Sequence, residues 1–358
     1  MQHAIPCLFM RGGTSRGPFF RASDLPSAIA ERDRVLLAVM GSPDARQIDG
    51  LGGADPLTSK VGIVSRSARD GVDLDFLFAQ VLIHESRVDT TPNCGNMLAA
   101  VVPFALETGL VSAKGEIATF RVHTQNTGTL ADISVRLLDG KPVYAGEAKI
   151  DGVPGTASPV NISFLDTEGS VCGALLPTGN RIDQFDGVAV TCIDNGMPVI
   201  LLSATDAGVT GYETRDELNK NAALKARIES IRLKAGAAMG LGDVSKKVVP
   251  KVSLVAPPRA GGSLCTRTFI PHDCHASIGV LGAVSVATAA VLEGTVAARI
   301  CSPAAENDGH RRSISVEHPT GEFTVNFTLD PSDKSRVVSA ELLRTARLIM
   351  RGEVYVRR

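Results

Sequence analysis

One cysteine stands where a long apolar segment begins, in the stretch TTPNCGNMLAAVVPFALETGLV. The small polar residues before it, with Asn93 as the expected N-cap, predict a helix that ends near Gly109. A helix N-terminus carries unpaired N–H groups and partial positive charge, which stabilise a thiolate and bind anions. Cys94 is therefore a candidate acid–base group, with Gly95 and Asn96 beside it. The alternative is a buried cysteine that only packs.

A lysine follows a glycine-rich segment in IDGLGGADPLTSKV and opens a run typical of a strand. Removal from water favours the neutral amine, so Lys60 held in a cleft would suit a base. A solvated lysine is the alternative. The segment lacks the order GxxxxGK[ST] of a phosphate-binding loop, which argues against nucleotide hydrolysis.

Several turns carry polar groups that suit a carboxylate ligand. The segment RGGTSRG combines arginines, hydroxyls and backbone N–H groups. Similar turns occur in LLPTGN and DNGMP, and CHASIGVLG precedes a second apolar helix. Glu317 and His318, in VEHPTGEF, are expected to pair near the surface. The candidate carboxylate ligands, besides Gly95 and Asn96, are Arg11, Thr14, Ser15, Arg16, Thr178, Asn195, Arg267 and Ser277.

The sequence lacks the common motifs of metal- and cofactor-binding enzymes. The sequence has neither HExxH nor GxGxxG, so neither a metal nor a cofactor is expected. A lysine, a thiol and anion-binding turns suit one class of reaction, in which a proton is removed beside a carbonyl or carboxylate and returned elsewhere.

Composition narrows the class of protein. The net charge of −1 and the absence of Trp argue against a nucleic-acid or anionic-membrane partner. The seven cysteines are odd in number and form no CxxC pair, which argues against a zinc ribbon or a disulfide scaffold. The sequence shows neither a signal peptide nor a membrane span, so we expect a cytoplasmic protein with reduced thiols.

The order of elements predicts an α+β fold in two domains. Strand patterns dominate, and each half contains one helix that is apolar nearly all round, which a curved sheet must cover. An earlier helix, within SDLPSAIAERDRVLLAVMGSP, is expected to be capped by Ser23 or Asp24 and to end at Gly41. The segment PTGNRIDQFDG is expected to link the domains. The predicted domains are 1–186, completed by a strand near 345–358, and 187–344.

These motifs, in this order and over nearly the whole chain, resemble the 2-methylaconitate cis–trans isomerase family, which shares the diaminopimelate epimerase fold. Segments that carry the resemblance are RGGTSRG, QIDGLGGADPLTSKV, NCGNMLAAV, CGALLPTGN, CIDNGMPV, FIPHDCHASIGVLGAVSVATA and VEHPTGEF. Within the family, MGSPDARQIDG, CIDNGMPV and FIPHDCHASIGV look most like the 4-oxalomesaconate tautomerases and isomerases of gallate and protocatechuate catabolism.

The resemblance implies two pseudo-symmetric domains, each a curved, mostly antiparallel sheet around a central helix, with the active site between them. It also implies a catalytic pair, which TSK places at Lys60 and NCGN at Cys94. Related epimerases use a second cysteine at the second helix start, where this chain has Ser277. A serine is a poor acid–base group, which argues against a two-cysteine racemase. Arg16 replaces the lysine that is usual in RGGTSKG.

The expected reaction is an allylic or keto–enol proton shift in a small unsaturated tricarboxylate, with 4-oxalomesaconate as the first candidate. Alternatives are the isomerisation of 2-methylaconitate, a racemase reaction and a non-catalytic tricarboxylate-binding protein. Which of Lys60 and Cys94 is the base stays open, as does assembly into a homodimer.

Overall fold

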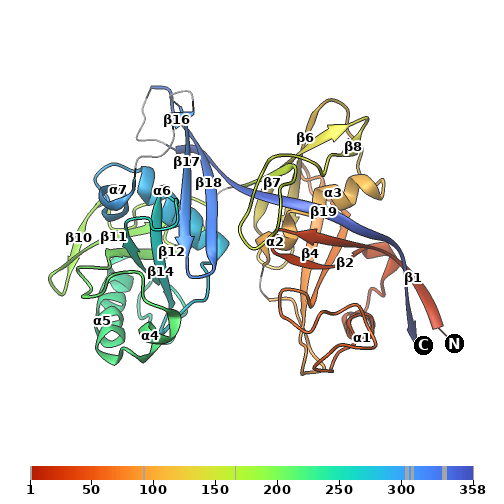
Figure 1. Ribbon diagram of the computed structural model, residues 1–358, viewed down its shortest axis with the longest axis horizontal. Helices are drawn as coiled ribbons and strands as arrows, with labels where there is room; N and C mark the ends of the chain where they lie inside the picture. The colour runs from red at the N-terminus through yellow and green to blue at the C-terminus, as the bar shows by residue number, and fades with distance from the viewer. Residues whose placement is uncertain are drawn as a thin grey trace. The chain divides into compact units, whose positions relative to one another are not determined.

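The computed structural model describes residues 2–91, 93–165, 167–302, 306–307, 310–332 and 337–357 (Figure 1). Its contacts divide the chain into two units, the first formed by Met1–Leu165 with Leu343–Arg358 and the second by Asp166–Leu342. The sequence analysis placed the first boundary after residue 186. The expected linker PTGNRIDQFDG instead supplies β10 (Asp183–Phe185), which pairs with β11 (Val188–Asp194) inside the second unit.

The first unit is a closed ring of strands. In spatial order the ring contains β1 (Gln2–Gly12), β2 (Ser15–Arg21), β3 (Lys60–Arg66), β4 (Leu74–Val81), β6 (Ile117–Thr124), β7 (Leu130–Leu138), β9 (Pro159–Phe164) and β19 (Val337–Arg357). Strand β19 pairs with both β9 and β1, which closes the ring. The pairs β2/β3 and β4/β6 are parallel. Short strands β5 (Val88–Asp89) and β8 (Lys141–Pro142) extend β4 and β7.

The apolar segment after Cys94 forms the centre of this ring, as two short helices rather than one. Helix α2 (Gly95–Leu98) contacts β1 and β2, and α3 (Val101–Glu107) contacts β3 and β7. Between them the N–H groups of Ala99 and Ala100 bond to carbonyls three residues earlier, as in a 3₁₀ turn. Pro103 has no N–H to offer the carbonyl of Ala99, so the expected continuous helix is interrupted there.

A second helix covers the outside of the ring. Helix α1 (Ile29–Met40) buries Leu36, Val39 and Met40 against outward-facing residues such as Val61 and Ile63. The predicted cap at Ser23 or Asp24 is wrong, because residues 22–24 form a separate 3₁₀ turn, η1 (Ala22–Asp24), and α1 begins after Ala28 without a side-chain cap. The predicted end at Gly41 is confirmed, with a left-handed φ of 73°.

The second unit repeats this pattern of strands. Its order is β10, β11, β12 (Pro198–Ser203), β13 (Lys251–Ala256), β14 (Leu264–Ile270), β17 (Arg311–His318), β18 (Gly321–Leu329) and the first part of β19. Here β12/β13 and β14/β17 are parallel, as β2/β3 and β4/β6 are in the first unit. Strands β15 (Asp273–Cys274) and β16 (Glu306–Asn307) extend β14 and β17. The α+β class and the internal repeat are therefore confirmed.

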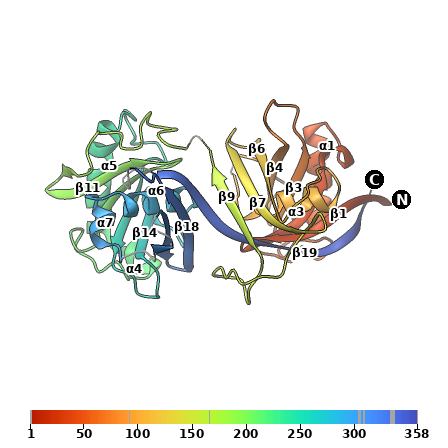
Figure 2. The ribbon, with the colours of Figure 1, turned by 90° about the horizontal axis from the view of Figure 1, so that it is seen from above.

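Helix α6 (Val280–Val291) is the central helix of the second unit and contacts β11, β12, β17 and β18 (Figure 2). Helix α7 (Val296–Ile300) follows it, while α4 (Arg215–Lys220) and α5 (Ala222–Ala238) lie on the other face of the sheet. The predicted apolar helix is confirmed, since every residue from Gly282 to Val291 is buried.

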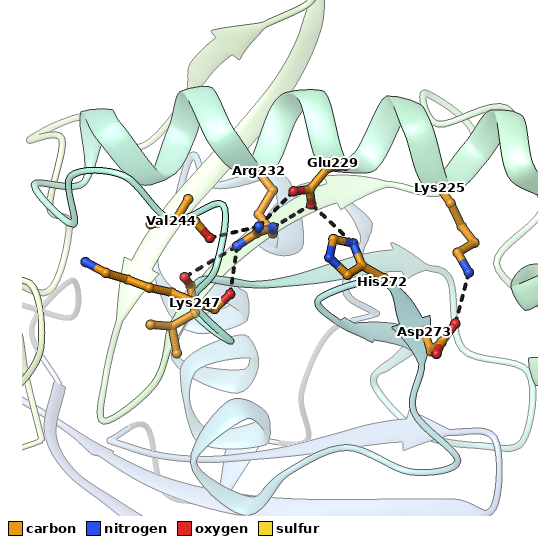
Figure 3. A network of polar contacts seen from close by, with 8 residues as sticks. Lys225, Glu229, Arg232, Val244, Lys247, His272 and Asp273 are labelled. Carbon is orange, nitrogen blue, oxygen red and sulfur yellow. Dashed lines mark hydrogen bonds and ion pairs between the residues drawn. The ribbon is translucent and has the colours of Figure 1, made fainter.

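Helix α5 holds the segment that follows it through one buried arginine (Figure 3). Arg232 is 0% exposed and bonds Glu229 through two of its nitrogens, at 2.6 and 2.8 Å. Its other contacts are the backbone carbonyls of Val244, Lys247 and Val249. The network stabilises the outer layer of the second unit. None of the helices in the described ranges is long and apolar enough to cross a membrane.

Candidate active site

Lys60 points toward the central helices of the first unit. It opens β3, where the next residue, Val61, belongs to the outward core beneath α1. Because side chains alternate along a strand, Lys60 and Gly62 face inward. Gly62 leaves room for the Phe19 ring, because a Cβ at this position would lie 2.3 Å from it. Phe19 in turn packs on Phe104 of the central helix α3, with ring centroids 5.7 Å apart.

The Lys60 amine is removed from bulk water. The residue is 8% exposed, and its Nζ lies 4.8 Å from the centroid of the Phe78 ring. The same nitrogen donates a 2.7 Å hydrogen bond to Oε1 of Gln80. In the described part of the chain no Asp or Glu forms an ion pair with this lysine. The Lys60 side chain is therefore buried and held by neutral groups.

Cys94 occupies the N-cap position of α2. Its backbone is extended, with φ −136° and ψ 97°, and its carbonyl accepts from the N–H of Leu98. The cap was expected at Asn93, but that side chain bonds the N–H of Cys94 itself, at 2.8 Å, and α2 has no side-chain cap. The first N–H groups of a helix have no partner within it. The half-buried thiol thus begins a helix, as the sequence predicted.

The turn between β1 and β2 connects the helix start with the lysine. On one side, a Cβ on Gly12 would lie 2.3 Å from the carbonyl oxygen of Asn96, and Asn96 Nδ2 bonds Thr14 Oγ1 at 3.0 Å. On the other side, a Cβ on Gly17 would lie 1.8 Å from the carbonyl oxygen of Lys60. The two candidate groups therefore belong to segments packed against the same turn.

Two buried polar atoms at or beside this turn lack a hydrogen-bond partner within the described ranges. Ser15 is 1% exposed, and its Oγ has no hydrogen-bond partner among the residues the structure describes. The same holds for Oδ1 of Asn96. Arg16 is exposed, lies over the Phe9 ring at 5.9 Å and forms no ion pair within the described ranges. These three residues suit a carboxylate best.

Three other candidates already use their polar groups within the protein. Arg11 donates to the carbonyl of Gly13 and to both oxygens of Thr345, so it fixes β19 to the turn. Thr178 donates to Asp183 at 2.6 Å within its own turn. Asn195 is 7% exposed, and it forms hydrogen bonds with Thr167, Ser285 and Thr288.

Arg267 lies on the face of β14 that is opposite to α6. The neighbours two residues away, Cys265 and Phe269, belong to the core between the sheet and α5, and alternation places Arg267 with them. Its guanidinium bonds the carbonyls of Glu213 and Thr266, and the side chain is 8% exposed. The structure does not bring Arg267 to the start of α6.

Ser277 lies two residues before Gly279, the N-cap of α6, whereas Cys94 is itself an N-cap. Its Oγ is 3.3 Å from Nε2 of His318.

The expected surface pair of Glu317 and His318 is wrong, because successive residues of β17 point to opposite faces. Glu317 is 6% exposed and accepts backbone N–H groups from a loop, at Arg259, Ala260 and Gly262.

The sequence analysis missed the residues that hold Lys60 in place. Gln80 lies opposite Lys60 in the β3/β4 register. Gln47, which is 1% exposed, donates to Ser42 and Ser59 and accepts from the N–H of Ala54, so it fixes the segment before β3. Only the strand pairing and the path of that segment identify these glutamines, and neither is visible in a local pattern.

The remaining thiols are structural. Burial raises the pKa of Cys7 to about 11, and burial together with Asp194 raises the pKa of Cys172 to about 12. Burial is also the largest cause that raises the pKa of Cys192, Cys265, Cys274 and Cys301. Among the described residues no group of His, Cys, Asp and Glu is arranged to hold a metal ion.

Curated relatives match the chain over nearly its whole length. A protein from Novosphingobium sp. (strain KA1), named (4E)-oxalomesaconate Delta-isomerase, is 56% identical over 353 residues, covering 99% of this chain and 98% of the relative. The 4-oxalomesaconate tautomerase of Pseudomonas putida is 56% identical over 357 residues, covering 100% of this chain and 97% of the relative.

Solved structures agree in fold. The crystal structure of a methylitaconate-delta-isomerase is 37% identical and superposes with a TM-score of 0.86, covering 99% of this chain and 96% of that one. A hydroxyproline epimerase from Agrobacterium vitis, at 12% identity and a TM-score of 0.52, covers 98% of this chain and 92% of its own, and shares the fold alone. The family model described as PrpF protein matches residues 2–357, and the chain therefore belongs to the PrpF protein family.

Proposed function

We propose that this chain is an isomerase that moves a proton within 4-oxalomesaconate, a small unsaturated tricarboxylate, in the catabolism of aromatic acids. The observation that carries the proposal is the 56% identity, over almost the full length, to two proteins that are named for this substrate. Relatives named for other substrates are more distant, at 37% for a 3-methylitaconate isomerase and 35% for a 2-methyl-aconitate isomerase.

Lys60 and Cys94 are the proposed acid–base pair. One of them removes a proton from a carbon next to the conjugated system, which leaves a dienolate, and the other returns a proton at the far end. Atoms and electrons balance without an oxidant or a reductant, because the product is an isomer. Two observations support the pair, namely the burial of Lys60 beside Phe78 and Gln80 and the position of Cys94 at the start of α2.

The turn between β1 and β2 is proposed to hold substrate carboxylates. Arg16 offers an exposed guanidinium without an ion pair in the described ranges, while Thr14, Ser15, Gly95 and Asn96 provide short-range polar contacts. Charge-assisted hydrogen bonds to these groups would stabilise the dienolate as well as the bound substrate. Ser277 stays a proposed carboxylate ligand.

A proton NMR time course with 4-oxalomesaconate in D₂O tests this function. We expect the substrate signals to convert to those of an isomer, with deuterium at the position that receives the proton. The same experiment with 2-methylaconitate is the comparison, and faster turnover of 2-methylaconitate would contradict the proposed substrate. Thermal stabilisation by 4-oxalomesaconate without any turnover would instead indicate a binding protein. Assembly into a homodimer and a cytoplasmic location are further proposals.

A further inference from the structure

We propose that Gln80 is a positioning residue for Lys60, which keeps the amine directed into the site with a neutral acceptor instead of a carboxylate. The proposal rests on the proposed function, because it gives the lysine of that site its geometry. Gln80 lies directly opposite Lys60 in the antiparallel β3/β4 pair, where side chains on the same face are neighbours.

The amide of Gln80 has only one orientation that satisfies its surroundings. Its Nε2 donates to two backbone carbonyls, those of Pro56 at 3.1 Å and Ser59 at 2.9 Å. Rotation of the amide by 180° would place its oxygen against both carbonyl oxygens and its NH₂ group against the Lys60 amine. The oxygen must therefore face Lys60 Nζ, to which it is bonded at 2.7 Å.

The carbonyls of Pro56 and Ser59 connect the Gln80 amide to the segment that directly precedes β3. Ser59 directly precedes Lys60, and its own hydroxyl is held by Gln47 at 2.7 Å and by the carbonyl of Val81 at 2.7 Å. The Lys60 backbone, its amine and the amide that holds it thus belong to one bonded cluster. Because the amine also lies 4.8 Å from the centroid of the Phe78 ring, Gln80 and Phe78 together limit where the amine can point.

The choice of an amide has a chemical consequence. A carboxylate at position 80 would hold the ammonium form of Lys60, whereas an amide oxygen accepts a hydrogen bond from either form. The elements packed against Lys60 carry several charged or titratable groups, among them Arg16 from the turn, Asp55 from the segment before β3, Cys94 before α2 and Asp75 on β4. Asp55 Oδ1 bonds the N–H of Leu57, and Asp75 bonds His123, so neither is paired with the lysine.

Two substitutions of Gln80 test the proposal through pH–rate profiles. For Gln80→Met we expect kcat to fall about tenfold, the effect of losing one hydrogen bond, with a smaller change in KM. For Gln80→Glu we expect the limb of the profile that depends on Lys60 to move to higher pH by about one unit, whichever role the lysine has. The matched control is Gln184→Glu, an exposed residue of β10 in the second unit, for which the profile should stay unchanged.

A measurement on the unmodified protein covers the case in which these variants do not fold. With lysine labelled at Cε and glutamine at Nε2, the NMR signals of Lys60 and of the Gln80 side-chain amide should titrate together with pH. Independent titration, or wild-type profiles for both Gln80 variants, would overturn the proposal. If the protein does not turn over 4-oxalomesaconate, the proposed function fails, but the NMR titration still decides the role of Gln80.

Discussion

At the scale of single residues, the proposed mechanism depends on what distinguishes Cys94 from the six other thiols. Cys94 begins a helix and is half-buried, whereas burial raises the pKa of each other thiol. The sequence suffices to propose Cys94 and Lys60, because their motifs are local. It could not identify Gln80, because only the register of β3 and β4 places this residue beside a lysine 20 positions earlier in the chain.

Thiol labelling tests this distinction. At about pH 8, well below the pKa values of about 11 for Cys7 and about 12 for Cys172, those thiols remain protonated and react slowly with iodoacetamide. We expect peptide mass spectrometry to find Cys94 labelled first, and 4-oxalomesaconate to slow that labelling. Cys172 and Cys301 are the internal controls, since they are half-buried as well. Labelling of either one as fast as Cys94 would contradict this assignment.

At the scale of elements, close packing sets the position of the lysine. The sequence predicted β1, β2, β3 and the apolar helices from their patterns, but not the interruption between α2 and α3. The continuous apolar run concealed the effect of Pro103, and the distance between Gly17 and Lys60 depends on how two parallel strands pack.

Substitution of Gly17 by Ala tests that packing. The new Cβ would meet the carbonyl oxygen of Lys60 at 1.8 Å, so β2 or β3 must shift. We expect a loss of about 3 kcal/mol in the free energy of unfolding, measured by urea denaturation, together with lower activity. Gly352→Ala on β19 is the matched control, because nothing lies within 4 Å of its Cβ position. Equal stability of the two variants would refute the packing argument.

The buried arginine of α5 gives a second test at this scale. Arg232→Leu removes the donor from the carbonyls of Lys247 and Val249, and it leaves Glu229 with His272 as its remaining partner. We expect this to cost about 3 kcal/mol in the free energy of unfolding of the second unit. Lys247→Ala is the control, because the network uses the carbonyl of Lys247 and not its amine (Figure 3). A Lys247 variant as unstable as the Arg232 variant would contradict this reading of the network.

At the scale of the whole molecule, one long strand completes both units. Residues 337–342 of β19 pair with β18, while residues 346–357 pair with β1 and close the first ring. The sequence analysis anticipated that a C-terminal strand belongs with the N-terminal half. It could not predict the closed ring, because closure depends on pairings between the two ends of the chain.

Removal of residues 346–358 tests the closure. Without that strand β1 loses one of its two partners and exposes unpaired backbone groups, so the first unit should no longer unfold cooperatively. Hydrogen exchange should then show lost protection in β1–β9, with protection retained in β11–β14. Tyr355→Ser is the control, since this side chain is 58% exposed. A truncated chain with full protection in β1–β3 would contradict the role given to β19.

The most direct test of the Lys60–Cys94 pair is the rate of 4-oxalomesaconate isomerisation, followed by proton NMR, in Lys60→Met and Cys94→Ser. Matched controls are Lys141→Met, on the exposed start of β8, and Cys301→Ser. We expect each site variant to keep its melting temperature and to lose at least about 100-fold in kcat, while both controls turn over normally. A folded Lys60 or Cys94 variant that retains activity close to that of its control would contradict the proposed mechanism.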